Sequence, residues 1–359
     1  MDMMKKSTKA SILRNLSIYG PVIIAFIILQ TLVNGGNLSS SLKGQLVPIC
    51  AYIVMAVSLN LTVGILGELS LGHAGFMSVG AFSGVVACIA LEGLVPSNPL
   101  RMFISMAVGT AFAGIAGFLI GIPVLRLKGD YLAIVTLAFG EIIKNIMNCL
   151  YVGVDAKGLH FSFLTSAKDL NLMEGGKVII DGPMGISGIP KLSTFAMGFA
   201  LILVTLFVVL NLVNSRAGRA IMALRDNSIA AESVGIPVTR YKMMAFVVSS
   251  ALAGGAGTLF AMNYSTIIAT KFSFNTSILI LVFVVLGGLG NIRGSIIAAA
   301  VLTVLPEMLR QFNDYRMLIY AIVLIFVMIM TNNENIKGFI EVTKLKLMPK
   351  AKQKAKGDK

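Results

Sequence analysis

Long apolar runs, separated by short polar or glycine-rich segments, recur along the whole chain. A helix needs about 20 predominantly apolar residues to cross the hydrocarbon core of a bilayer. The clearest runs of this kind are Leu16–Val33, Leu46–Ile65, Ala74–Leu91, Met102–Leu125, Tyr131–Val152, Phe195–Val213, Met243–Asn263 and Tyr315–Met330. A further run, Thr276–Leu309, is too long for one span and contains several glycines, so we divide it into two short helices that reverse direction near Arg293. The pattern predicts an all-α integral membrane protein, a polytopic helical bundle of about ten transmembrane segments, some of them short or broken by glycine.

Positive charge is concentrated in the segments that flank the apolar runs, and the formal net charge is +14. Ten spans place the basic N-terminal arm, Arg126 and Lys128, the loop 214–242 and the tail on one side of the membrane, which the positive-inside rule identifies as cytoplasmic. Nine spans would place the tail on the opposite side. We therefore expect a transmembrane domain over residues 1–331, with a cytoplasmic loop at 214–242 and an outer loop at 153–194. A basic cytoplasmic tail follows at 332–359, and both termini are expected in the cytoplasm.

The composition argues against a soluble protein or a catalytic one. Hydrophobic residues make up 56% of the chain and charged residues 13%, whereas soluble domains carry roughly 25% charged residues. The basic residues are not interleaved with aromatic ones, so we expect contact with membrane lipid and no nucleic-acid partner. Cys50, Cys88 and Cys149 lie in apolar contexts without CxxC spacing, which indicates neither disulfide bonds nor a metal site. The sequence lacks HExxH, GxSxG and GxxxxGK[ST] motifs, so no catalytic residue is assigned and any ATP would be bound by another chain.

Polar residues inside the predicted spans are candidates for a translocation path. Glu141, Lys144, Asn145 and Asn148 follow one another at helical spacing and lie on one helix face. A charge at bilayer depth costs about 2.5–3.5 kcal/mol, so this face should point into the bundle or a wet cavity. Two interpretations remain open: the face lines the path, or Glu141 and Lys144 form a structural pair that locks helices together.

Two further polar residues belong to this candidate path. Glu68 lies at the end of the second span. Asn60 lies near the middle of that span, where an isolated asparagine joins helices more often than it binds a ligand.

Two glycine-rich segments interrupt the spans. Backbone that unwinds at membrane depth is tolerated only where it lines a cavity or is buried in protein, and paired glycine-broken segments indicate a transporter site. One segment contains Gly67, Gly72 and Gly75. The other contains Gly287, Gly288, Gly290 and Gly294. Both fall on the predicted cytoplasmic side, so they do not superpose under an inverted repeat.

The cytoplasmic segment Gly218–Pro237 predicts a pair of short helices. Ala220–Leu224 and Ser228–Val234 favour helix, Asp226 and Asn227 are suited to cap the junction, and Gly235 ends the second helix. A short polar helix pair between spans has no lipid in which to bury itself, which favours a docking surface for a soluble partner.

Four segments together resemble one known family. They are Gly67–Phe76, Leu127–Ile142, the loop Gly218–Pro237 with the following Tyr241–Gly257, and Gly287–Gly294. Their residues and their order resemble the LivM-type permease of branched-chain amino-acid ABC importers. The Lys-rich tail and the outer loop around Phe161–Asp181 depart from the pattern, and we attach no function to them.

The resemblance implies a permease subunit in a bacterial cell membrane. Its implied partners are a second, homologous permease, two cytoplasmic ATPase subunits that bind ATP and magnesium, and an extracytoplasmic solute-binding protein, so no cofactor is expected in this chain. The implied ATPase-coupling residues are Gly218, Arg219, Arg225, Asp226, Ala231, Glu232 and Gly235. Relatives of this type carry other small solutes, and the binding protein largely imposes selectivity, so the resemblance leaves the exact substrate open.

Two other classes of function remain to be compared with an ABC importer. An ion-coupled secondary transporter would need relay residues in several spans, whereas Glu141 and Lys144 are the clearest such pair. An intramembrane enzyme would need a paired catalytic set, which the sequence lacks.

Overall fold

The computed structural model describes residues 19–35, 39–127, 129–155, 158–163, 170, 176–309 and 315–332. The chain divides into two units, Met1–Thr303 and Val304–Lys359. The basic N-terminal arm, Lys128 and nearly all of the basic tail lie outside the described residues, so the structure does not bear on the predictions made for them.

The described residues are mostly helical. Six helices are long and apolar enough to cross a membrane. The first, Ser41–Leu66, combines α2 (Ser40–Asn60) with the π-helical turn η1 (Leu61–Leu66). The other five are α3 (His73–Ala90), α4 (Asn98–Val124), α5 (Asp130–Cys149), α6 (Phe195–Asn214) and α9 (Val238–Ala261). Tyr19–Asn34 and α10 (Phe274–Gly287) are shorter apolar helices. They are followed by α11 (Ile292–Met308), which crosses the unit boundary, and by α12 (Arg316–Asn332) in the second unit. Each predicted run thus contains a helix, and within the part of the chain that the structure describes six of these helices meet the length of a full span.

The core of the first unit lies around α2, α3 and α9. Within the most apolar stretch of Ser41–Leu66, 89% of the residues are buried in the protein, whereas the corresponding share for α5 is 22%. Small residues let the inner helices approach closely: the Thr258 hydroxyl of α9 donates to the Gly80 carbonyl of α3 (2.8 Å), and a methyl group on Gly109 of α4 would lie 2.7 Å from that same carbonyl oxygen. Gly109, Gly117 and Gly121 of α4 are all buried, so small residues form a packing seam along this helix.

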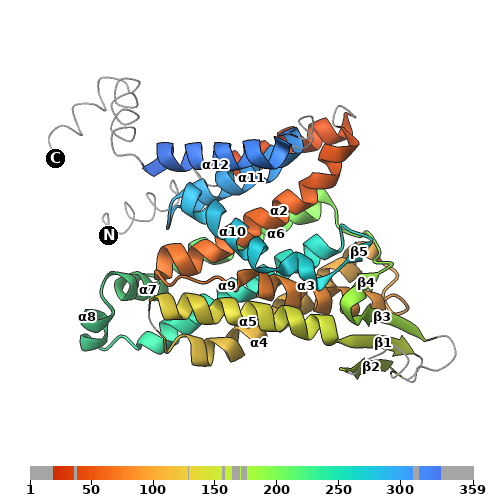
Figure 1. Ribbon diagram of the computed structural model, residues 1–359, viewed down its shortest axis with the longest axis horizontal. Helices are drawn as coiled ribbons and strands as arrows, with labels where there is room; N and C mark the ends of the chain where they lie inside the picture. Colours follow the sequence, from red (N-terminus) through yellow and green to blue (C-terminus); the bar gives the residue numbers. More distant parts are fainter. Residues whose placement is uncertain are drawn as a thin grey trace, which may run out of the picture. The chain divides into compact units, whose positions relative to one another are not determined.

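A small antiparallel sheet corrects the prediction of an all-α fold. Its strands are β1 (Tyr151–Asp155), β2 (Gly158–Ser162), β3 (Lys177–Asp181), β4 (Ile186–Ser187) and β5 (Thr266–Ile267), in the order β2-β1-β3-β4-β5. Four of the strands come from the loop 153–194 and its flank, whose valines and isoleucines favour extended backbone. Figure 1 shows the sheet at one end of the helices of the first unit and α7–α8 at the opposite end.

Candidate functional site

The first glycine-rich segment lies at the end of α2. There the helix widens into the π-helical turn η1, whose residues are all buried, and it ends at Gly67 with φ 82°. This left-handed conformation favours glycine, because a Cβ atom would strain the backbone. The chain then runs without regular structure until α3 begins at His73. Leu71 in this stretch donates its backbone N–H to the Thr136 hydroxyl of α5 (3.0 Å), so the unwound backbone is held by a neighbouring helix.

The second glycine-rich segment joins α10 to α11. Gly288 and Gly290 have φ values of 89° and 79°, so the turn depends on glycine. Gly287 is the last residue of α10, and Gly294 lies in the first turn of α11, where it packs against Gly287.

The structure refines which predicted glycines form the breaks. Gly67 and Gly72 lie in the first break, and Gly288 and Gly290 lie in the second. The other three predicted glycines lie in helix ends, which corrects the prediction for them: Gly287 ends α10, and Gly294 and Gly75 lie in the first turns of α11 and α3. A methyl group on Gly75 would come within 3.0 Å of the Gly140 Cα atom of α5, so Gly75 serves helix packing.

The two breaks meet at Asn60. The fully buried Asn60 amide accepts a hydrogen bond from the Gly290 backbone N–H (2.8 Å) and donates one to the Ser295 hydroxyl of α11 (2.9 Å). A methyl group on Gly64 would overlap the backbone of Gly290, so the two main chains touch. Asn60 therefore joins helices, which is the first of the two roles considered for it. Its role in a translocation path stays a prediction.

The cytoplasmic segment forms the two short helices that the sequence predicts. These are α7 (Arg216–Asp226) and α8 (Ser228–Ser233), and the Asn227 side chain between them caps α8 by accepting from two backbone N–H groups. Asp226 is the last residue of α7 and does not cap α8. Gly235 follows α8 with φ 84°.

The predicted coupling residues divide into two groups by burial. Gly218 and Ala231 are buried, and a methyl group on Gly218 would lie 2.3 Å from the Leu212 and Val213 carbonyl oxygens of α6. Exposed residues are Arg219, Arg225, Asp226, Glu232 and Gly235. Apolar side chains accompany them at the surface: Ile229 and Val234 are 74% and 77% exposed.

Two polar contacts connect α7 and the start of α9 to the chain around the first break. Arg225 of α7 donates from Nη1 to the Gly64 carbonyl (2.8 Å). Lys242 of α9, itself buried, forms an ion pair with Glu68. Sequence reasoning did not identify Lys242 or Ser295 as part of the site, because their partners lie 174 and 235 residues away along the chain.

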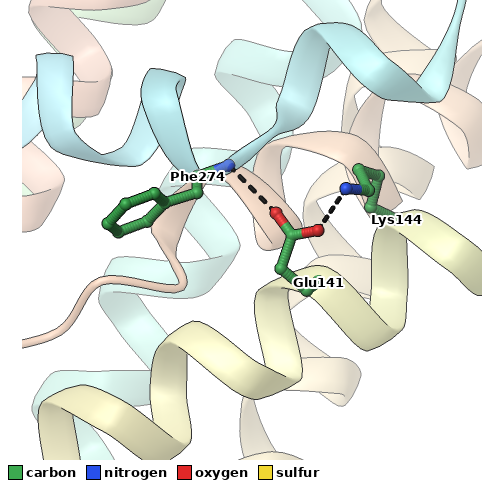
Figure 2. Close-up of polar contacts among 3 residues, drawn as sticks. All are labelled: Glu141, Lys144 and Phe274. Carbon is green, nitrogen blue, oxygen red and sulfur yellow. Dashed lines mark hydrogen bonds and ion pairs between the residues drawn. The ribbon is translucent and has the colours of Figure 1, made fainter.

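The polar stripe of α5 lies at the contact with α10. Figure 2 shows Glu141 between Lys144, with which it forms an ion pair, and the backbone N–H of Phe274, from which it accepts a hydrogen bond (3.1 Å). Phe274 is the first residue of α10, where helical N–H groups lack partners and favour a negative charge. The side chains of Glu141 and Lys144 are 32% and 18% exposed, and Asn145 is exposed. The structural pair is thus present, while contact of this stripe with a solute stays a prediction.

Comparison with known proteins places these features in a family. The family model described as "Branched-chain amino acid transport system / permease component" matches residues 41–328. LivM of Salmonella typhimurium, a high-affinity branched-chain amino acid transport system permease protein, is 35% identical over 332 residues, which cover 86% of this chain and 71% of the relative. LivM of Escherichia coli is 34% identical over 322 residues, which cover 77% of this chain and 66% of the relative.

More distant similarity extends to permeases with other names. The fructose import permease protein FruG of Bifidobacterium longum is 24% identical over 268 residues, covering 73% of this chain and 72% of the relative. No solved structure matches the chain. The family indicates a multi-pass membrane protein and a transport subunit, not a catalytic enzyme. On the length of the family match and the identity to both LivM proteins, this chain belongs to the family of permease components of branched-chain amino-acid transport systems.

Proposed function

We propose that this chain is the permease subunit of an ABC importer that carries branched-chain amino acids, or a related small polar solute, across a bacterial cell membrane. Partner subunits would hydrolyse the ATP, so this chain would bind neither ATP nor magnesium. The observation that carries the proposal is the helix pair α7–α8, which exposes Ile229 and Val234 beyond the ends of the spans. Apolar side chains in that position have no lipid to cover them, and a soluble partner subunit would bury them.

We further propose ten transmembrane segments with both termini in the cytoplasm. Six helices meet the length of a full span, and the four shorter ones, Tyr19–Asn34, α10, α11 and α12, coincide with the remaining apolar runs. An even number of spans places the basic segments on one side, as the positive-inside rule requires. The sheet and α7–α8 lie at opposite ends of the first unit, which fits an outer loop at 153–194 and a cytoplasmic loop at 214–242.

The proposed complex contains a second, homologous permease, two ATPase subunits and a binding protein on the outer side. The open face of α5 supports the second permease, since this face carries the partly exposed pair Glu141 and Lys144. Charged groups facing lipid are costly, so a protein surface or a wet path should cover them.

Cysteine labelling tests the orientation of α7–α8. In a chain with the exposed native cysteine removed by Cys149→Ser, Ser233→Cys of α8 should react with a membrane-impermeant maleimide only after the cells are permeabilised. Cells lacking the ATPase subunits should be used, so that docking does not shield the thiol. Met184→Cys, an exposed position beside the sheet, is the matched control and should react on intact cells. Labelling of Ser233→Cys on intact cells would contradict the cytoplasmic position of the docking surface.

Reconstitution tests the function itself. Liposomes that contain this permease with its partner permease and ATPases should take up radiolabelled leucine only when the binding protein is outside and ATP is on the ATPase side. Leucine with the binding protein should also stimulate ATP hydrolysis. Uptake driven by an ion gradient without ATP would instead support a secondary transporter, and stimulation by a different solute alone would redirect the substrate assignment.

A further inference from the structure

Arg225 points toward the membrane-spanning helices, although it belongs to the helix pair proposed to receive the ATPases. It lies in the last turn of α7, next to Leu224, and both Leu224 and Ile221 are buried and fix α7 against its neighbours. From there Nη1 of Arg225 donates to the Gly64 carbonyl in η1, 161 residues earlier in the chain (2.8 Å). Contact with a partner subunit alone would not require this bond within the chain.

The Gly64 carbonyl accepts this bond because the helix ends beyond it. The backbone N–H of Glu68, which would continue the helical ladder, turns back to the Thr62 carbonyl instead (3.1 Å). Carbonyls in the last turn of a helix lack intrahelical partners, and a cationic donor is favoured there. Hydrogen bonds to charged groups are also stronger than those between neutral groups.

Three glycines leave room for the arginine. A methyl group on Gly67 would lie 2.8 Å from Cγ of Arg225, so the aliphatic stem rests on the Gly67 backbone. A methyl group on Gly290, in the turn between α10 and α11, would lie 3.5 Å from Nη1. Gly64 in turn touches Gly290, whose N–H is bound by Asn60. One side chain of α7 therefore reaches the point where both glycine breaks meet.

We propose that Arg225 is the positioning residue through which movement of α7–α8 is transmitted to both glycine breaks. The inference deepens the proposed function and rests on it. π-helical turns and left-handed glycines are segments where the backbone can change conformation at low cost, and such segments serve as hinges in closing and opening transitions. A displacement of α7 pulls on η1 through the Arg225–Gly64 bond and on the α10–α11 turn through the contact of Gly64 with Gly290.

The Glu68–Lys242 ion pair has the opposite mechanical role. Lys242 belongs to α9, one of the core helices, so this pair ties the start of the first break, just after Gly67, to the core of the bundle. The chain at the end of the π-helical turn thus has one tie to the docking helices, at Gly64, and another to the core, at Glu68.

The test measures the coupling ratio, leucine taken up per ATP hydrolysed, in the reconstituted complex. Arg225→Met keeps the stem that packs on Gly67 but removes the guanidinium. We expect the coupling ratio to fall at least about tenfold, the scale of a lost hydrogen bond to a charged group, while binding of the ATPase subunits and their hydrolysis persist. Arg126→Met removes an exposed positive charge elsewhere and should leave the ratio unchanged. If Arg225→Met fails to accumulate, Arg225→Gln, whose amide is too short to reach Gly64, should show the same fall.

The possible outcomes separate this inference from the proposed function. A coupling ratio equal to that of the wild type, with normal assembly, overturns the role of Arg225 and leaves the importer intact. Loss of ATPase binding in the variant also overturns it, because Arg225 would then belong to the docking surface. Failure of the wild-type permease to bind any ATPase subunit would contradict the proposed function instead.

Discussion

Gly235→Trp should abolish ATP-driven uptake while the protein still inserts into the membrane. Gly235 follows α8 at the exposed end of the proposed docking surface, and no atom lies within 4 Å of a methyl group built on it. A side chain there would begin in open space on the exposed surface, where a tryptophan would occupy the space proposed for the docking partner. A ring that keeps the partner from closing on α8 would disrupt neighbouring contacts worth about 2 kcal/mol or more, which corresponds to a loss of uptake of at least about thirtyfold.

The control for this variant must separate bulk from backbone strain. With φ 84°, Gly235 adopts a conformation that most side chains disfavour, so tryptophan adds both effects. Asparagine tolerates the left-handed region, and Gly235→Asn should therefore retain most of the uptake. The measurement is leucine uptake and solute-stimulated ATP hydrolysis in the same reconstituted complex. Normal uptake together with unchanged stimulation in Gly235→Trp would remove Gly235 from the docking surface.

The features that the sequence predicts correctly depend on local signals. Apolar runs identify the helices, because a helix that is buried in lipid or protein needs apolar side chains over several consecutive turns. The cap at Asn227 and the left-handed Gly235 were predictable, since both depend on residues within one turn. The positions of the two glycine breaks follow from the same kind of signal.

The contacts between these features could not be predicted, because they join residues that are far apart in the sequence. The bonds of Arg225 to Gly64 and of Asn60 to Gly290 span 161 and 230 residues. Each glycine is recognisable as a break, but only the packed structure shows that the breaks touch. The sheet was missed for a related reason: its strands are short, and β5 comes from a separate loop, so its pairing with β4 joins segments that are far apart in the sequence.

Glu141→Gln should abolish uptake and leave the complex assembled. Glutamine retains an oxygen that can accept from the Phe274 N–H, so the contact between α5 and α10 is preserved (Figure 2). What it removes is the negative charge on the open face of α5. If that charge contacts the solute or its ammonium group in the path, uptake should fall to about 1% of the wild type or less, the scale of a lost charge-assisted hydrogen bond of about 3 kcal/mol. Normal uptake by this variant would end the assignment of Glu141 to the path.

A double variant distinguishes the two interpretations of the Glu141–Lys144 pair. In the single variant Lys144 also loses its ion-pair partner, and an unpaired charge at bilayer depth costs about 2.5–3.5 kcal/mol, so loss of uptake could come from a destabilised helix. Glu141→Gln combined with Lys144→Gln removes both charges and therefore that cost. If the pair only joins helices, the double variant should regain uptake, since no unpaired charge remains. If the carboxylate serves the path, uptake should stay lost while size-exclusion chromatography shows an intact complex. We expect this second result, because partly exposed charges at membrane depth need a wet or protein-lined path to face.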